Sequence, residues 1–139
     1  MEQELKGKIA FVTGSGRGLG SGRARKRAER GADIILHDIS WDAPARFGEY
    51  KDLGEVVKSI EALGVRSMGV VGNIGDKAAI AAMKAEIDSK FGDVEILVNC
   101  AGGDIGASGN KPVPNDLLGI PYEDIVALTN NNLIGTMLV

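Results

Sequence analysis

The stretch Thr13-Gly14-Ser15-Gly16-Arg17-Gly18-Leu19-Gly20 decides the fold of this chain. It follows an apolar run over residues 8–13, which predicts a buried strand, and it opens a helix-length stretch over residues 18–30. Glycines at such a place let the backbone approach a pyrophosphate, and a helix N-terminus offers free N–H groups and the positive end of a dipole. The order of strand, glycine-rich turn and helix therefore favours a nucleotide-binding turn. The alternative is a tight turn that binds no ligand.

The spacing of these glycines excludes two common kinds of nucleotide-binding turn. The dinucleotide pattern G-x-G-x-x-G is absent, and no glycine–lysine pair has the neighbours that a P-loop requires. The spacing that remains is T-G-x-x-x-G-x-G over residues 13–20.

Strands and helices alternate along the rest of the chain. Further strands are predicted over residues 33–38, 66–71 and 93–99, and further helices over residues 52–63, over residues 77–91 after an Asp76 N-cap, and from Tyr122 onward. Such alternation predicts βαβ units and an α/β fold with a doubly wound parallel sheet, of the Rossmann type. We interpret residues 1–139 as one dinucleotide-binding domain. Ligands of such sheets bind beyond the carboxyl ends of the strands.

Composition limits the classes of partner. The formal net charge of −3 argues against a nucleic-acid binder, and the longest run without a polar residue, Ala78–Met83, is too short to span a membrane. The chain has one cysteine, Cys100, and its acidic start, residues 1–4, lacks the basic region of a signal peptide. We therefore expect a cytoplasmic protein. With His37 as the only histidine, no metal cluster is expected.

Asp38 ends the second predicted strand, 18 residues after Gly20. A carboxylate at this position can accept hydrogen bonds from both ribose hydroxyls of an adenosine, and it would repel a 2′-phosphate. This favours NAD over NADP, although Arg17 could pair with a phosphate and points the other way. The alternative is a solvated acid at the end of a strand.

Three segments together resemble the short-chain dehydrogenase/reductase family. Residues 8–20 resemble the opening strand and turn of that family. Asn99-Cys100-Ala101-Gly102 resembles its N-N-A-G segment with Cys100 in place of the second Asn, and Asn132-Leu133-Ile134-Gly135-Thr136 resembles its N-L-x-G-T segment. The three segments occur in the expected order, so together they are more specific than any one of them.

The resemblance implies roles for individual residues. Asp38 would hold the adenosine ribose with Ile39 beside the adenine, Asn73 with Ile74 would face the adenine amino group, and Asn132 would support a proton-relay water. The positions implied to bind the cofactor are Gly14, Ser15, Arg17, Gly18, Leu19, Gly20, Asp38, Ile39, Asn73, Ile74, Asn99, Ala101 and Gly102. The activity implied is hydride transfer between NAD and a small alcohol or carbonyl substrate, in a homo-oligomer. Substrate selection would lie in the glycine- and proline-rich loop 103–121.

The sequence departs from the family pattern in its catalytic residues. The family's Tyr-x-x-x-Lys is absent, because Gly54 follows Tyr50 by four residues and Val126 follows Tyr122 by four. The chain stops inside its fifth helix, and we interpret it as the N-terminal portion of a longer enzyme or a chain that ends early. Two alternatives stay open: an S-adenosylmethionine-dependent methyltransferase and a non-catalytic cofactor-binding fragment.

A second departure is the basic run in the first helix. Leu19, Arg23, Arg27 and Arg30 share one helical face. We expect this face to pack on the sheet, where unpaired guanidinium groups would be costly to bury. Either the arginine stems turn outward or the helix is displaced. A nucleic-acid patch is the alternative interpretation.

Overall fold

The structure, a computed structural model, describes residues 3–139. Met1 and Glu2, which begin the acidic N-terminal segment, lie outside the described residues. Four parallel strands form one sheet in the order β3-β2-β1-β4. The strands are β1 (Ile9–Val12), β2 (Asp33–Asp38), β3 (Ser67–Val71) and β4 (Ile96–Val98).

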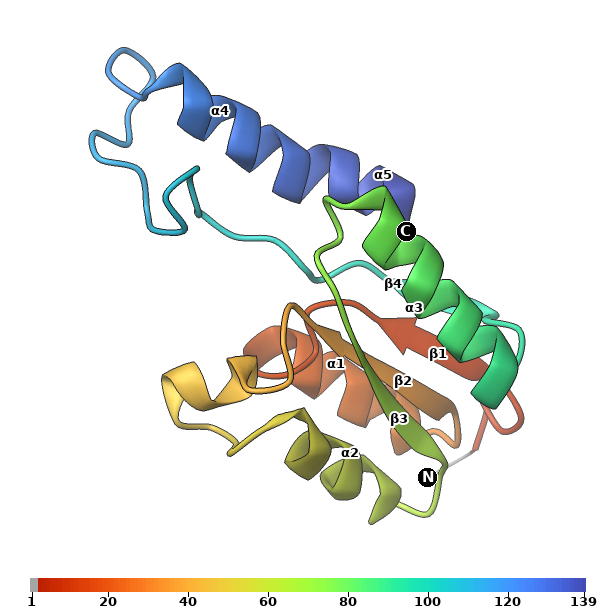
Figure 1. Cartoon of the computed structure of the whole chain (residues 1–139). Helices are drawn as coiled ribbons and strands as arrows, with labels where there is room; N and C mark the ends of the chain where they lie inside the picture. Colours follow the sequence, from red (N-terminus) through yellow and green to blue (C-terminus); the bar gives the residue numbers. More distant parts are fainter. Residues whose placement is uncertain (1–2) are drawn as a thin grey trace.

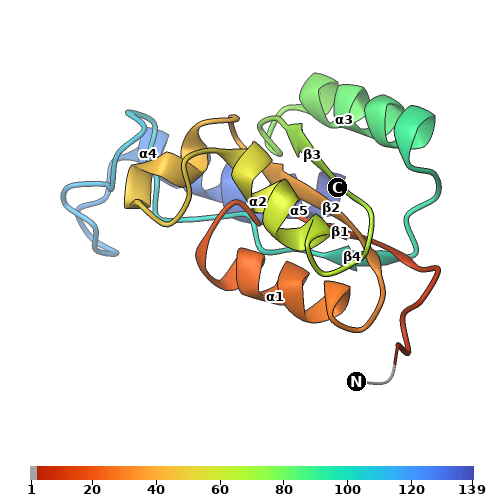
Figure 2. The ribbon, with the colours of Figure 1, turned by 90° about the horizontal axis from the view of Figure 1, so that it is seen from below.

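Helices cover both faces of this sheet. Helices α1 (Gly18–Ala28) and α2 (Leu53–Glu61) lie on one face, and α3 (Lys77–Lys90) lies on the other (Figures 1 and 2). The side chains of β2 alternate accordingly: Ile34 and Leu36 pack toward α1 and α2, whereas Ile35 packs with residues of α3. The prediction of a doubly wound parallel α/β fold is confirmed.

Two helices begin at aspartates that cap them. The Asp52 carboxylate accepts a hydrogen bond from the Glu55 N–H at 2.9 Å, and the Asp76 carboxylate accepts one from the Ala78 N–H at 2.8 Å. The predicted N-cap at Asp76 is confirmed. The segment between β2 and α2, predicted as a loop, contains a short 3₁₀ helix, η1 (Ala43–Phe47).

Helix α1 packs on the sheet through small residues, so the predicted packing face is wrong. The buried residues of α1 are Gly20, Ser21, Ala24 and Ala28. Leu19 is 81% exposed, and the Arg27 guanidinium donates to the Arg23 carbonyl oxygen at 3.0 Å. The small side chains let the helix approach the strands closely, so the arginines need not be buried.

The last helical segment is continuous but irregular. It comprises α4 (Tyr122–Thr129), a π-helical turn η2 (Asn130–Ile134) and α5 (Gly135–Leu138). Figure 1 shows this segment running from the tip of the preceding loop back to the side of the sheet that carries α3. Val139 contacts the apolar cluster of that side. π-helical turns occur frequently at functional sites.

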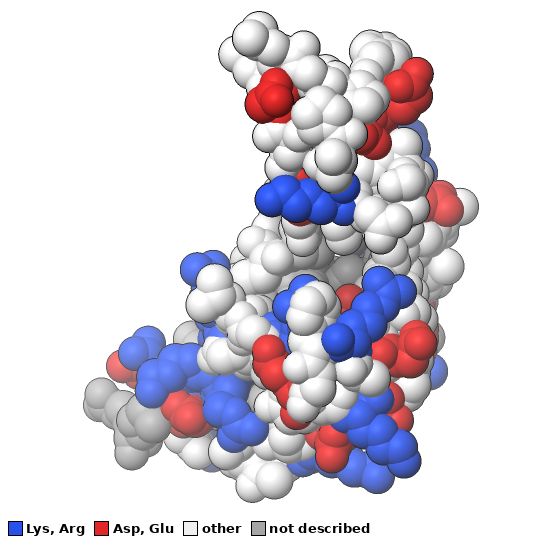
Figure 3. All heavy atoms as spheres, turned by 90° about the vertical axis from the view of Figure 1, so that its left-hand side faces the viewer, with Lys and Arg blue, Asp and Glu red and all other residues white. Residues whose placement is uncertain are grey.

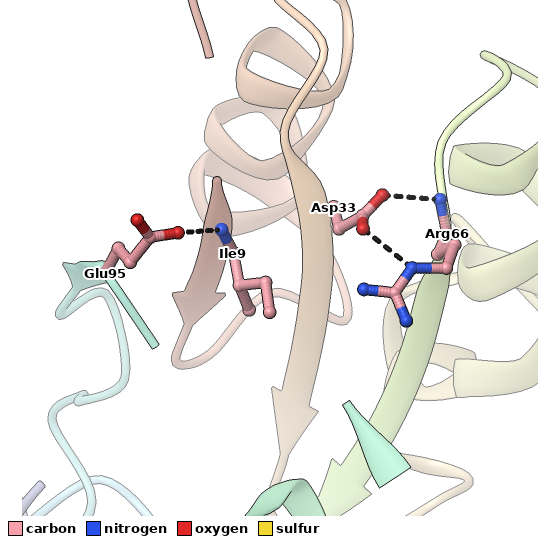
Figure 4. Close-up of polar contacts among 4 residues, drawn as sticks. All are labelled: Ile9, Asp33, Arg66 and Glu95. Atoms are coloured by element: carbon pink, nitrogen blue, oxygen red, sulfur yellow. Dashed lines mark hydrogen bonds and ion pairs between the residues drawn. The ribbon is translucent and has the colours of Figure 1, made fainter. Parts of the chain in front are cut away.

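Charged side chains join the strands near their amino ends (Figure 4). The Asp33 carboxylate accepts from the backbone N–H of Arg66 at 2.9 Å and from its guanidinium at 2.7 Å, which joins β2 to the start of β3. The Glu95 carboxylate accepts from the Ile9 N–H at 3.1 Å and pairs with Lys8 at 2.6 Å. Over residues 3–139, no helix is long and apolar enough to cross a membrane.

Candidate functional site

The turn after β1 is built so tightly that two of its positions require glycine. Gly14 has φ +61°, and a Cβ there would lie 2.7 Å from the Ala101 Cα, in the segment that follows β4. A Cβ on Gly20 would overlap the carbonyl oxygen of Gly14. The predicted turn therefore forms, and it brings Gly14 directly beside the residues after β4.

The N-terminus of α1 presents backbone N–H groups at this turn. The first intrahelical bond runs from the Ser21 N–H to the Arg17 carbonyl, so the N–H groups of residues 18–20 precede it. Arg17, at the N-cap, makes no side-chain capping bond. Gly18 has φ +55°, and a Cβ there would meet open space. A ligand can thus approach the backbone from outside.

A carboxylate of the chain itself binds to a backbone N–H group of this turn. The Glu49 carboxylate, from the segment after η1, accepts a hydrogen bond from the Gly18 N–H at 2.8 Å. Beside it, the Arg17 guanidinium lies 3.4 Å from the centre of the Phe47 ring. The carboxylate occupies the kind of position that a phosphate oxygen takes at a helix N-terminus. The turn therefore suits the pyrophosphate of a dinucleotide.

Asp38 lies against this turn, as a ribose-binding residue would need to do. A Cβ on Gly16 would overlap the Asp38 carboxylate and lie 2.9 Å from Pro44 Cγ. Gly16 was missed by the sequence reasoning, although it stands between two selected glycines. The other Asp38 oxygen accepts from the Ile39 N–H at 2.8 Å, and the Ile39 side chain is 56% exposed.

Two buried hydroxyls hold the turn from beneath. Thr13 Oγ1 accepts from the backbone N–H groups of Cys100 and Ala101, both at 3.1 Å, and thereby joins the ends of β1 and β4. Ser15 Oγ donates to the Val12 carbonyl oxygen at 2.7 Å. Ser15, predicted to contact the cofactor, directs its hydroxyl into the protein. Thr13 was not selected as a site residue, although the T-G spacing contained it.

The segment after β4 meets the π-helical turn. Asn132 Oδ1 accepts from the Gly103 N–H at 2.8 Å, and Asn132 Nδ2 donates to the Gly103 carbonyl at 2.9 Å. A Cβ on Gly102 would lie 2.6 Å from the same Asn132 oxygen. The structure thus brings Asn132 and Gly102 together, while Asn99 is exposed at the end of β4.

Asn73 and Ile74 lie after β3, but their side chains are already engaged. Asn73 Oδ1 accepts from the Gly75 N–H at 2.9 Å. Ile74 is buried and packs so closely on Gly135 that a Cβ there would overlap it. Asn130 Nδ2 donates to the Gly75 carbonyl at 3.2 Å. This segment therefore contributes backbone and apolar surface, and an adenine contact through the Asn73 amide stays a prediction.

His37 is a buried residue that the sequence reasoning did not select for the site. It is 2% exposed and lies beneath the turn, with Nδ1 3.1 Å from the Gly14 nitrogen and Nε2 2.8 Å from the Gly72 carbonyl oxygen. Burial lowers the pKa of His37 below its ordinary value, and the Gly72 carbonyl and the Asp38 charge oppose this effect. The ring is therefore neutral at pH 7.

The surface around the site is uneven in charge. On the face shown in Figure 3, Lys and Arg side chains gather over the lower part, and the upper part, formed by the loop and α4, is mostly uncharged. Val113, Leu117 and Leu118 of the loop are 86%, 94% and 97% exposed. Over residues 3–139, no three His, Cys, Asp or Glu side chains form a group that could hold a metal ion.

A hollow of about 460 Å³ lies at the opposite end of the sheet, where Lys6, Gly31 and Arg66 contribute to its lining. The Asp33 carboxylate there is already paired with Arg66. We therefore place the candidate site at the carboxyl ends of the strands, where glycines leave the backbone accessible.

Comparisons with known proteins show the family and the fold of the chain. The model of the short chain dehydrogenase family matches residues 8–139. The 2,3-dihydro-2,3-dihydroxybenzoate dehydrogenase of Bacillus subtilis (strain 168) is 37% identical over 98 residues, which are 70% of this chain and 34% of that protein.

Two solved structures have the same fold. A hydroxysteroid dehydrogenase from Escherichia coli superposes with a TM-score of 0.77 and 30% identity, covering 98% of this chain and 50% of that one. An NAD⁺-bound xylitol dehydrogenase gives a TM-score of 0.77 and 26% identity, covering 98% and 46%. The chain spans about a third of the length of the curated relative described above and about half of these solved chains. On the match over residues 8–139, the chain belongs to the short-chain dehydrogenase family.

Proposed function

We propose that this chain forms the cofactor-binding part of an oxidoreductase that transfers hydride between a nicotinamide dinucleotide, preferably NAD, and an alcohol or carbonyl substrate. The observation that carries the proposal is the contact between the glycine turn and Asp38, whose carboxylate lies against Gly16. Support comes from the family, and from a relative whose structure is described as NAD⁺-bound.

Each group at the site would have a distinct task. The N–H groups of residues 18–20 would bind the pyrophosphate once the Glu49 carboxylate moves aside, and Asp38 would accept the hydroxyls of the adenosine ribose. The nicotinamide would supply the hydride chemistry. Asn132 would fix the backbone of Gly102 and Gly103 beside the nicotinamide ribose, because it bonds both polar groups of Gly103.

The preference for NAD follows from charge. The Asp38 carboxylate would repel a 2′-phosphate, and the Arg17 guanidinium is stacked on Phe47 at the end of η1. The exposed apolar residues of the loop, which include Leu117 and Leu118, would contact the substrate. A homo-oligomer and a cytoplasmic location accompany this proposal as expectations.

Cofactor binding is the direct test, because the Tyr-x-x-x-Lys pattern is absent from these 139 residues and turnover is therefore a poor readout. We expect the chain to bind NADH more tightly than NADPH in fluorescence titrations. Asp38→Asn should reduce this ratio by about tenfold, since a charged hydrogen bond contributes roughly 1.5–3 kcal/mol. Binding of S-adenosylmethionine in place of both dinucleotides would support the methyltransferase alternative and contradict the proposal.

A further inference from the structure

His37 connects three parts of the candidate site. It lies near the end of β2, and its ring bridges the turn after β1 and the end of β3. Its backbone is held as well, because the His37 N–H donates to Ser15 Oγ at 3.0 Å and its carbonyl accepts from the Ser15 N–H at 2.8 Å. The edge of the ring meets Phe11, with the two ring centres 6.1 Å apart.

The partners of the ring define its protonation state. A backbone N–H can only donate, so Nδ1 must accept from Gly14, and a carbonyl can only accept, so Nε2 must carry the proton that it donates to Gly72. Only the neutral Nε2–H tautomer satisfies both contacts. In the imidazolium form, Nδ1–H would oppose the Gly14 N–H, and two donors would face each other in a buried place.

We infer that His37 is a positioning residue for the dinucleotide, whose neutral ring holds Gly14 where the pyrophosphate-binding turn requires it. The inference rests on the proposed function. The ring is buried and bonds the Gly14 N–H, so it acts through the turn. Gly14 has little freedom to move, because Ala101 and the Gly20 position lie directly against it. Protonation of the ring therefore disturbs the turn and weakens cofactor binding.

Few charges face this ring. Within its own strand, the Asp38 carboxylate acts on it and favours the protonated form. The contacts of the ring from β1 and the turn are the apolar Phe11 ring and the Gly14 N–H, and the contact from the end of β3 is the Gly72 carbonyl. The uncharged Ser15 hydroxyl bonds the His37 backbone N–H. Burial outweighs the Asp38 charge, and the pKa of His37 lies below its ordinary value. Loss of binding is therefore expected on the acid side of about pH 6.5.

The test compares wild type with two variants by calorimetric titration of NAD⁺ between pH 8 and pH 5. His37→Leu keeps an apolar side chain but offers no acceptor to Gly14, and we expect about tenfold weaker binding at pH 8, the cost of one unpaired N–H. His37→Asn supplies an amide acceptor that does not titrate. It should restore binding to within about threefold of wild type at pH 8. It should also remove the acid-side loss that wild type shows.

A second measurement does not depend on the folding of a variant. Nitrogen NMR of wild type, in which His37 is the only histidine, should show the Nε2–H tautomer and a pKa below 6.5. The inference is overturned if the ring is the Nδ1–H tautomer, if His37→Leu binds NAD⁺ as wild type does, or if His37→Asn keeps the acid-side loss. If wild type binds neither NAD⁺ nor NADP⁺ at pH 8, the proposed function itself fails.

Discussion

The two ends of the sheet are held together by different chemistry. At the amino ends, exposed charged side chains join neighbouring strands, as Asp33 does with Arg66 and Glu95 with Lys8 (Figure 4). At the carboxyl ends, the joints beneath the turn are buried and uncharged: Thr13, Ser15 and His37 bond backbone groups there. The charged residues Arg17, Asp38 and Glu49 lie around the rim of that turn.

This difference shows how a sheet end can be made rigid and still receive a ligand. Side chains hold the turn from below, and the backbone N–H groups of residues 18–20 precede the first intrahelical bond, so they lack an intrahelical acceptor. A surface ion pair contributes about 0–1 kcal/mol to stability, whereas removal of one partner of a buried hydrogen bond costs about 1–3 kcal/mol. The carboxyl end should therefore be the more sensitive to substitution, in both stability and binding.

Gly14→Ala should have the largest effect. The substitution combines a positive φ with a Cβ that would lie 2.7 Å from Ala101, so we expect a loss of about 3–5 kcal/mol of stability and no measurable NADH binding. Gly22→Ala is the matched control, because Gly22 lies within α1 in open space. It should raise the free energy of unfolding by about 0.5–1 kcal/mol in urea denaturation. If Gly14→Ala and Gly22→Ala changed stability and NADH binding equally, the turn at the carboxyl ends of the strands would not be the sensitive region that we describe.

Thr13→Val should rank second. It removes the hydroxyl that accepts from both Cys100 and Ala101, and two partly buried N–H groups then lose a partner. We expect a loss of about 1–3 kcal/mol in urea denaturation and weaker NADH binding. Thr13→Ser retains the hydroxyl and should lose less than half as much. A neutral Thr13→Val would mean that the hydroxyl does not join the two strand ends.

The pH dependence of stability should rank third. Because burial lowers the pKa of His37 in the folded state, the unfolded chain binds more protons near pH 6. The free energy of unfolding should therefore decrease as the pH falls below about 6.5, by at most about 1.4 kcal/mol per pH unit. The difference between wild type and His37→Asn across this range isolates the contribution of the ring. If the free energy of unfolding of wild type minus that of His37→Asn decreased as the pH rises from 5 to 7, the sign would contradict this account.

Arg66→Met should have the smallest effect. It removes an ion pair in which the arginine side chain is 58% exposed, so the expected loss is below about 1 kcal/mol. NADH affinity should not change, because Arg66 lies at the far end of the sheet. A clear loss of NADH binding in this variant would show that the two ends are coupled.

The sequence predicted the fold well because its signals are local. The apolar run before Gly14 and the aspartate caps at the starts of α2 and α3 specify elements that lie next to them in the chain. The packing face of α1 was mispredicted because the prediction followed the charged side chains of the helix and overlooked its small ones. Ala24 and Ala28 give a weak signal in a helix crowded with arginines, and yet they are buried.

The site was predicted in part. The glycines and Asp38 were selected from their spacing, and the structure brings Asp38 against the turn, while their role in cofactor binding stays a prediction. Gly16, Thr13 and the bridging role of His37 were missed, because each depends on a contact between strands that are distant in the sequence. Without the register in which β2 pairs with β3, the sequence does not show that Gly72 lies beside His37.

The most direct measurement of the central claim is an amide NMR titration of the labelled chain with NADH. We predict that the largest shift changes fall on residues 18–20 and on Asp38, with little change at Asp33 and Arg66. Shift changes confined to the amino ends of the strands, or none at saturating NADH, would contradict the account.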